Sequence, residues 1–447
     1  MLLRRKAYAA MLAWKNHSQG STALLLTGAR RVGKSYLCRQ FAKAEYKSSI
    51  FIDFANVSSD VKTSIEHDSH DLDLFFTKLS SIYRTKLYPR ETLLVFDEVQ
   101  LFPRARQLIK YLVADGRYDY IETGSLLSIK QNVKDILIPS EEESLEVYPL
   151  DFEEFLWSLG DETTFEFLKM CYEKKMPLGQ ALHRKIMTDF RIYMLVGGMP
   201  QTVLEYGKGK DFAATDGVKR SILTLYRNDI SKFAGNYQNK VNAIFDSLPA
   251  QLSKKEKKYK LSAIDADARM RDYEDSFMWL SDGMIVNPCF NATEPSAGLA
   301  LSGDHSTHKV YMGDTGLLVT QAFWNASYSD NELYKSILLD NLRVNEGMLM
   351  ENIVAQALRA NGHRLYFYSR NDAVNRENNI EIDFLVSKKM KICPIEVKSS
   401  AYTTHSSLDK FRRKFSKHLG DAYILYTKDV MVKNDITCLP LYMASFL

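Results

Sequence analysis

The chain of 447 residues is longer than a single hydrophobic core normally serves, so two or three domains are expected. Hydrophobic residues make up 45% of the sequence and charged residues 26%, proportions that exclude a collagen-like or disordered chain. The formal net charge is only +4, so the overall charge does not by itself require a nucleic-acid partner.

The sequence carries no sign of a membrane or of export. No apolar run approaches the roughly 20 residues of a membrane span, and the N-terminal stretch MLLRRKAYAAMLAW lacks a cleavage site. We therefore expect a cytoplasmic protein without membrane contact. The cysteines are widely scattered and odd in number, which predicts reduced thiols and no zinc cluster at Cys38, Cys171, Cys289, Cys393 and Cys438.

Short apolar runs alternate with amphipathic runs from residue 21 to about residue 150. ALLLTG, IFIDF, LLVFDEV and YDYIETGS have the character of strands, and helices are expected from Lys34 onward and near 72–86. Strands that alternate with helices predict a mostly parallel sheet covered on both faces. The first domain is therefore expected to be α/β and to occupy residues 1–150.

A glycine-rich loop follows the first of these strands. Residues 28–35 read GARRVGKS, which fits G-x-x-x-x-G-K-[ST]. In such a loop the backbone N–H groups face phosphate, and Lys34 has the catalytic role of neutralising the β- and γ-phosphates. Ser35 offers a hydroxyl ligand for Mg²⁺. The alternative is an ordinary turn, but the flanking strand and helix favour an ATP site formed by Gly28, Ala29, Arg30, Arg31, Val32, Gly33, Lys34, Ser35 and Tyr36.

Two carboxylates end a second buried strand, LLVFDE. They lie where the strands of an open α/β sheet present their carboxyl ends to a ligand. Asp97 is expected to hold Mg²⁺, and Glu98 to orient and deprotonate the attacking water. The alternative is a helix cap and a surface acid, but the phosphate loop favours the functional interpretation.

Further polar residues are candidates for the same site. Thr123 ends the next strand, where it is either a sensor of the γ-phosphate or a simple strand terminator. ATPases of this kind often receive an arginine from a neighbouring subunit, which would make the protein a homo-oligomer. The sequence does not choose among Arg104, Arg106 and Arg117.

The chain changes character after residue 150. Residues 151–300 have mostly helical periodicity and include the lysine run SKKEKKYK at 253–260. Beyond about residue 345, the helix MLMENIVAQALRA precedes three expected strands, LYFYSR, EIDFLVS and CPIEVKSS. A helix around DKFRRKF and a strand AYILYT complete a second α/β unit.

Several motifs together resemble a known family. GARRVGKS, LLVFDEVQ, ETGSLL, VYPLDFEEF, GGMPQ, YMGDTGLL and ENIVAQAL are similar to bacterial and archaeal AAA-type ATPases with a restriction-endonuclease-like C-terminal domain. The resemblance implies an AAA-type core at 1–150, a helical linker or lid at 151–214, a winged-helix segment at 215–315 and a PD-(D/E)xK domain at 316–447. The lysine run would then lie against DNA phosphates or form a solvated loop, and the stretch YMLVGGMP at 193–200 has no assigned chemical role.

The C-terminal carboxylates fit the endonuclease pattern that the resemblance implies. Asp383, Glu396 and Lys398 reproduce D-x₁₂-E-x-K, and the acidic Glu351 on the preceding helix would be the fourth member of the pattern. Residues two apart on a strand share a face, so two carboxylates and a backbone carbonyl would bind a second Mg²⁺ or Mn²⁺, with Glu351, Asp383 and Glu396 as the candidate acids, while catalytic Lys398 stabilises developing charge. Such a domain also occurs without catalysis, so cleavage stays open.

Two functions follow from these expectations. The first is a Mg-ATP-hydrolysing ATPase whose nucleotide state controls a DNA-binding or metal-dependent nuclease-like C-terminal domain. The alternative is a nucleotide-dependent signalling switch with a catalytically silent C-terminal binding module. A small-molecule kinase shares the phosphate loop, but the paired acids Asp97 and Glu98 and the additional domains disfavour it.

Overall fold

The computed structural model describes residues 3–124, 140–254, 258–264, 268–324, 346–371, 379–399 and 405–447. The chain divides into two compact units, each described here by itself. The N-terminal unit comprises Leu2–Tyr148 with Asp282–Met284, and the C-terminal unit comprises Pro149–Ser281 with Ile285–Leu447. None of the described helices is long and apolar enough to cross a membrane.

In its described residues, the N-terminal unit contains a parallel sheet of five strands in the order β2-β3-β4-β1-β5. Its strands are β1 (Ala23–Gly28), β2 (Ser48–Asp53), β3 (Thr92–Asp97), β4 (Asp119–Gly124) and β5 (Glu142–Val147). Its helices are α1 (Lys6–Ser18), α2 (Lys34–Glu45), α3 (Ser59–His67), α4 (Leu72–Tyr83) and α5 (Pro103–Asp115). The predicted α/β fold with a parallel sheet is confirmed.

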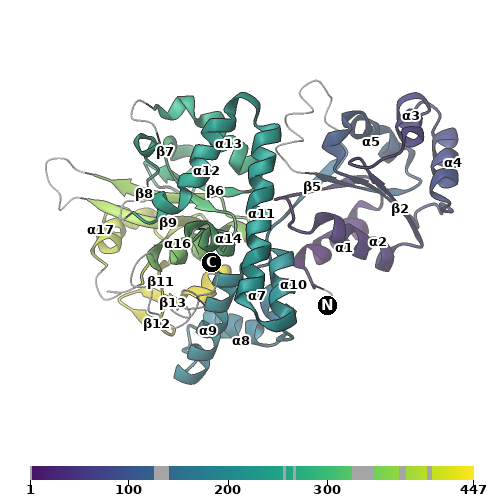
Figure 1. Ribbon diagram of the computed structural model, residues 1–447. Coiled ribbons are helices and arrows are strands. Elements are labelled where there is room, and N and C mark those ends of the chain that lie inside the picture. Colours follow the sequence, from purple (N-terminus) through teal and green to yellow (C-terminus); the bar gives the residue numbers. More distant parts are fainter. Residues whose placement is uncertain are drawn as a thin grey trace. The chain divides into compact units, whose positions relative to one another are not determined.

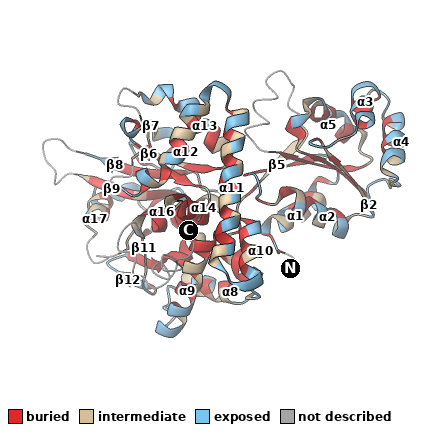
Figure 2. Cartoon of the chain, viewed as in Figure 1, coloured by how far each residue is buried: buried red, intermediate tan, exposed pale blue. Residues whose placement is uncertain are grey.

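Alternating side chains bury both faces of this sheet. On one face, Leu24 and Leu26 of β1 pack in a cluster with α1 and α2. On the other, Leu94 and Phe96 of β3 pack in a cluster with α3, α4 and α5 (Figure 1). Successive strand residues point to opposite faces, so the continuous apolar run LLVF serves both layers. Figure 2 accordingly shows buried strands between helices that are exposed on their outer sides.

Helices form the first part of the C-terminal unit, as predicted for the middle of the chain. They are α7 (Phe152–Ser158), α8 (Thr164–Lys174), α9 (Gln180–Val196), α10 (Pro200–Gly209), α11 (Phe212–Phe233), α12 (Gln238–Leu252) and α13 (Glu274–Asp282). Further along, the described residues also form α14 (Thr315–Ala322), α16 (Glu346–Ala360) and α17 (Ser406–Lys414). A capping box begins α7, because Asp151 and Glu154 each accept a hydrogen bond from the other's backbone N–H.

A mixed sheet forms the second part of the C-terminal unit. Among the described residues it has eight strands in the order β12-β13-β11-β10-β9-β8-β6-β7. They are β6 (Val286–Ala292), β7 (Gly303–Met312), β8 (Leu365–Arg370), β9 (Ile380–Lys388), β10 (Lys391–Val397), β11 (Ala422–Tyr426), β12 (Met431–Lys433) and β13 (Ile436–Pro440). β6 pairs with β8, so 286–312 of the expected winged-helix segment shares a sheet with the expected nuclease-like domain.

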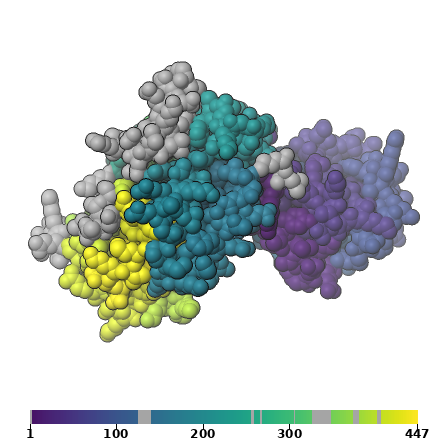
Figure 3. Space-filling view, turned by 90° about the horizontal axis from the view of Figure 1, so that it is seen from below, coloured from purple at the N-terminus to yellow at the C-terminus, as the bar shows by residue number. Residues whose placement is uncertain are grey.

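The C-terminal residues pack against the helices α8 and α9. Tyr442 Oη lies 2.8 Å from His183 Nδ1, and the rings of Phe446 and Phe165 have centroids 4.8 Å apart. Figure 3 shows these terminal residues in yellow beside the blue helices. All five cysteines are free and buried.

Candidate functional site

The predicted phosphate loop joins β1 to α2 at the carboxyl edge of the N-terminal sheet. Gly28 lies so close to β5 that a Cβ there would be 2.4 Å from the carbonyl oxygen of Val147. Gly33 begins α2 with a φ of 98°, and Arg31 also has a positive φ, of 69°. The loop therefore needs glycine at both ends. Ala29 and Val32 are buried within it, whereas Arg30, Arg31 and Tyr36 are exposed.

Arg5, which the sequence analysis did not single out, supports this loop. Its guanidinium donates hydrogen bonds to the carbonyl oxygens of Val32 (3.0 Å) and Tyr148 (2.6 Å). One side chain thus ties the loop to the end of the neighbouring strand β5. No local pattern distinguishes Arg5 from the other basic residues near it in the sequence.

The Lys34 side chain is buried and contacts the backbone of the loop. Its ammonium donates hydrogen bonds to the carbonyl oxygens of Gly28 (2.9 Å) and Ala29 (3.2 Å). Burial lowers the pKa of Lys34, and the nearby carboxylates of Glu98 and Asp97 oppose that shift. The ammonium therefore contacts the loop backbone and interacts electrostatically with both predicted acids.

Three polar side chains meet at the end of β3. Ser35 Oγ donates a 2.8 Å hydrogen bond to Asp97 Oδ1, and Thr123 Oγ1 donates to the same oxygen. Thr123 reaches this position because β4 lies between β1 and β3 in the sheet. A hydroxyl and a carboxylate are ligands that Mg²⁺ prefers, so Ser35 and Asp97 fit a magnesium ion at this point.

Glu98 has an unusual backbone conformation immediately after β3. Its φ is 56°, which is uncommon for a residue with a side chain and costs on the order of 1–3 kcal/mol. Its N–H donates to Thr123 Oγ1 (3.3 Å), and its carboxylate accepts a hydrogen bond from Gln100 Nε2 (2.5 Å). The strained residue thus lies beside Asp97 with its carboxylate held by Gln100.

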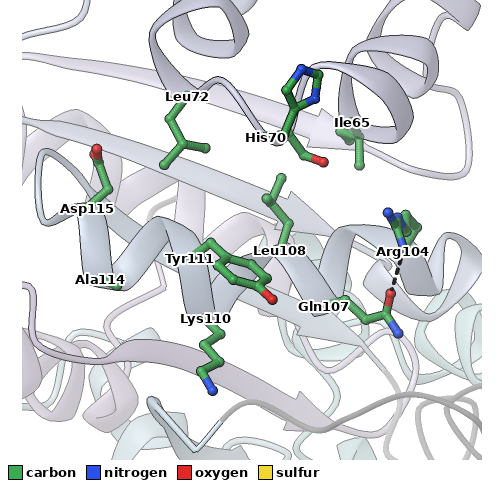
Figure 4. A pocket seen from close by; sticks show the side chains of 11 residues that line it. Ile65, His70, Leu72, Arg104, Gln107, Leu108, Lys110, Tyr111, Ala114 and Asp115 are labelled. Carbon is green, nitrogen blue, oxygen red and sulfur yellow. Dashed lines mark hydrogen bonds between the residues drawn. The ribbon is translucent and has the colours of Figure 1, made fainter.

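The three candidate arginines differ in what they contact. Arg106 is buried and pairs with Glu142 at 2.9 Å. Arg117 pairs with Asp115 and Asp73 at 2.7 and 2.6 Å. Arg104 is exposed and donates to Gln107 Oε1 at 3.2 Å, as Figure 4 shows. Burial thus prevents Arg106 from reaching a neighbouring subunit, a difference that composition alone did not reveal.

Arg104 also lines a cleft of about 800 Å³ on the N-terminal unit. The cleft is lined by residues of α5 and residues from the end of α3 to the start of α4, with Tyr111 and Leu108 extending into the space in Figure 4. Its helices cover the sheet face opposite to that of α2. The cleft is therefore distinct from the phosphate loop.

The predicted C-terminal pattern has the expected strand geometry. Glu396 and Lys398 form an ion pair of 3.0 Å, and Asp383 Oδ2 accepts a hydrogen bond from the N–H of Val397 (2.8 Å). Burial raises the pKa of Glu396, with Lys398 opposing the shift. Asp383 therefore lies beside the end of β10, where Glu396 is the second-last residue of the strand and Lys398 directly follows it.

The structure does not show the predicted second metal site. In the part of the chain that the structure describes, no group of three or more His, Cys, Asp or Glu side chains is placed to hold a metal ion. Glu351 instead accepts a hydrogen bond from Tyr311 Oη (3.1 Å). Lys309 lies 3.7 Å from Asp383 Oδ1, so an ammonium faces the acid expected to bind the metal. Lys309 was not among the predicted site residues. A lysine beside the apolar residues at the end of β7 is the sequence feature that could have indicated a buried charge there.

The motif at 193–200 has a packing role. Asp314 accepts hydrogen bonds from the N–H groups of Gly198 (2.6 Å) and Leu317 (2.9 Å). A Cβ on Gly316 would lie 2.5 Å from the backbone nitrogen of Gly197. The glycines of GGMP and GDTG therefore pack backbone against backbone, with Asp314 binding one segment to the other.

The sheet order, the glycine-rich loop and the acids after β3 define a P-loop nucleotide-binding domain. Residues 20–156 match the family model of the AAA domain, so the N-terminal unit is AAA-type and ATPase-like. Two further models match the chain: a domain of unknown function, DUF8612, at 187–328, and another, DUF4143, at 346–443. No curated protein matches the sequence.

Solved structures also show similarity to the chain. The Walker-type ATPase PABY2304 of Pyrococcus abyssi is 17% identical, covering 72% of this chain and 96% of its own, with a TM-score of 0.42. The ORC1 protein of Aeropyrum pernix in complex with DNA is 11% identical, covering 73% and 93%, with a TM-score of 0.29. The ADP form of ORC2 from the same organism is 12% identical, covering 77% and 95%, with a TM-score of 0.30. All three TM-scores are below 0.5.

Proposed function

We propose that the N-terminal unit binds and hydrolyses Mg-ATP. The observation that carries this proposal is the meeting of Ser35, Asp97 and Thr123 at the carboxyl edge of the sheet, beside a loop that contains Lys34. A hydroxyl, a carboxylate and an ammonium in this arrangement have the chemistry of a Mg-triphosphate site.

Each residue then has a defined task. The loop N–H groups and Lys34 bind the phosphates, and Lys34 exchanges its hydrogen bonds with Gly28 and Ala29 for bonds to phosphate oxygens. Ser35 and Asp97 would hold Mg²⁺, which would neutralise charge on the phosphate oxygens when bound. Glu98 orients the attacking water and accepts its proton.

Replacing Lys34 tests nucleotide binding directly. The Lys34→Ala variant should lose most of its affinity for ATP in an equilibrium binding measurement, because the buried ammonium that faces the phosphates is gone. Lys43, exposed on the same helix, provides a matched control, and Lys43→Ala should bind like the wild type. Equal affinity of the Lys34→Ala variant and the wild type would contradict the proposal.

DNA is the partner that the C-terminal unit favours. A cleft of about 1000 Å³ between β6, β8 and the end of α17 is lined by Arg370, Lys414, Lys417 and His418, with Glu294 also present. All four residues are exposed, so the charges of Arg370, Lys414 and Lys417 are available to a phosphate backbone. The lysine run at 253–260 adds no evidence, since residues 255–257 lie outside those described.

The nucleotide state of the N-terminal unit would then control binding at this cleft. We expect double-stranded DNA to stimulate ATP hydrolysis, and Arg370→Glu/Lys417→Glu to remove the stimulation while basal hydrolysis stays unchanged. Lys433→Glu, which reverses an exposed charge on β12 outside the cleft, is the control. Hydrolysis indifferent to DNA in every variant would instead favour the signalling switch. The subunit arginine and homo-oligomer stay predictions, with Arg104 as the exposed candidate.

A further inference from the structure

Lys309 is a buried cation in the interior of the C-terminal unit. It lies on β7, two residues before Tyr311, so both side chains point to the same face of the strand. The Lys309 side chain is only 1% exposed. Burying an ammonium without a partner costs many kcal/mol, so the fold retains this lysine only if acidic groups surround it.

Acidic side chains from two other elements surround the Lys309 ammonium. Its Nζ lies 3.2 Å from Glu381 Oε1 and 3.7 Å from Asp383 Oδ1, both on β9. Glu351 of α16 also acts on the ammonium through its charge. The Nζ also lies 5.0 Å from the centre of the Phe367 ring. Two carboxylates and an aromatic ring thus face the Lys309 ammonium.

A donor group of the chain lies beside each acid of the predicted metal site, although neither buried oxygen of Glu396 accepts a hydrogen bond among the described residues. Asp383 Oδ2 accepts from the N–H of Val397, and Glu351 Oε2 accepts from Tyr311 Oη. Glu396 Oε2 lies 3.0 Å from Lys398 Nζ. Each acid that was predicted to bind the metal thus contacts a donor that belongs to the chain itself.

We propose that Lys309 is the built-in cation of this acidic cluster and replaces the divalent metal that a phosphodiester-cleaving site of this pattern would need. Its ammonium neutralises Glu381 and Asp383 permanently, with Glu351 close by. Without a metal, no water is activated and no scissile phosphate is polarised there. The C-terminal unit consequently binds its partner without cutting it, and the cluster serves to hold β7, β9 and α16 together. This proposal is independent of ATP hydrolysis.

Metal binding is the first test. All variants carry Asp97→Asn, which removes the expected Mg²⁺ ligand of the phosphate loop, and binding of Mn²⁺ is followed by electron paramagnetic resonance. The Asp97→Asn protein should bind no Mn²⁺ at this cluster, and adding Lys309→Met should create a bound Mn²⁺. Adding Asp383→Asn to the Asp97→Asn/Lys309→Met protein should remove the bound Mn²⁺. Mn²⁺ bound by the Asp97→Asn protein and lost with Glu396→Gln would overturn the proposal.

Plasmid nicking tests the native cluster in case Lys309→Met does not fold. The wild type and Lys398→Ala are compared in Mg²⁺ and in Mn²⁺. We expect no nicking above background in either protein. Nicking by the wild type that Lys398→Ala abolishes would show a working metal site and overturn the proposal.

Discussion

The Ser35 hydroxyl donates a 2.8 Å hydrogen bond to the Asp97 carboxylate, although 62 residues separate them in the sequence. Parallel strands bring them together, because the loop after β1 and the end of β3 meet at the same edge of the sheet. Thr123 of the intervening strand β4 donates to the same carboxylate oxygen. This contact is the basis for the predictions about catalysis.

Removing the Asp97 charge should abolish the response to magnesium. Asp97→Asn keeps the shape of the side chain but weakens its hold on Mg²⁺, and we expect hydrolysis to fall about 100-fold or more. Steady-state hydrolysis measured over a range of Mg²⁺ concentrations checks this. Asp119→Asn is unsuitable as a control because Asp119 is buried against Arg90, so the exposed Asp60→Asn is used. An unchanged Mg²⁺ dependence in Asp97→Asn would contradict the assignment.

Replacing Thr123 tests whether this residue is a sensor of the γ-phosphate or only ends its strand. Its Oγ1 donates to Asp97 and accepts from the N–H of Glu98, so it positions both acids. Thr123→Val has nearly the same shape but no hydroxyl, and we expect hydrolysis to fall roughly 10-fold, on the scale of a lost hydrogen bond of about 1.4 kcal/mol. Thr123→Ser should retain most activity. If Thr123→Val hydrolyses ATP at the wild-type rate, Thr123 only ends the strand.

Glu122 predicts a dependence of stability on pH. It is fully buried on β4, and burial, followed by its neighbour Glu142, raises its pKa well above the ordinary value, against the effect of Arg106. The folded state binds the Glu122 proton more tightly than the unfolded state does. The protonated carboxyl therefore contributes to the free energy of unfolding at low pH, and this contribution is lost as the pH rises through the raised pKa.

Glu122→Gln should therefore make the stability of the protein less dependent on pH. Glutamine cannot ionise, so the melting temperature of the variant should exceed that of the wild type at pH 8 and differ little from it at pH 5. Each kcal/mol of added stability should raise the melting temperature by about 2–4 °C. Differential scanning calorimetry at the two pH values checks this. A difference between variant and wild type that is the same at both values would contradict the prediction.

Asp314 should contribute strongly to the stability of the C-terminal unit. Its buried carboxylate accepts hydrogen bonds from the N–H groups of Gly198 and Leu317, so Asp314→Ala leaves buried donors without an acceptor. We expect a loss of about 1–3 kcal/mol for each unsatisfied group, measured by urea unfolding. Asp272→Ala removes an exposed carboxylate and should cost less than about 0.5 kcal/mol. Equal losses in the two variants would refute this role.

The predictions for the N-terminal unit were based on short, contiguous sequence patterns. The loop at 28–35, the acids after β3 and the alternating strands are contiguous in sequence, and the parallel sheet then brings Ser35 and Asp97 together. What sequence reasoning missed depends on distant contacts. Arg5 reaches Tyr148, and Lys309 reaches Asp383, through folding that no short pattern specifies. Likewise, the pairing of β6 with β8 joins segments that were assigned to different domains.

The central claim is that Glu98 deprotonates the attacking water in a Mg-ATP site. The most direct test is the steady-state rate of Mg-ATP hydrolysis by the wild type and Glu98→Gln, with equilibrium ATP binding measured in parallel and the exposed Glu91→Gln as the control. We predict that Glu98→Gln binds ATP like the wild type but hydrolyses it roughly 10²–10⁴-fold more slowly, since it has lost its general base. Hydrolysis by Glu98→Gln at the wild-type rate would contradict this account.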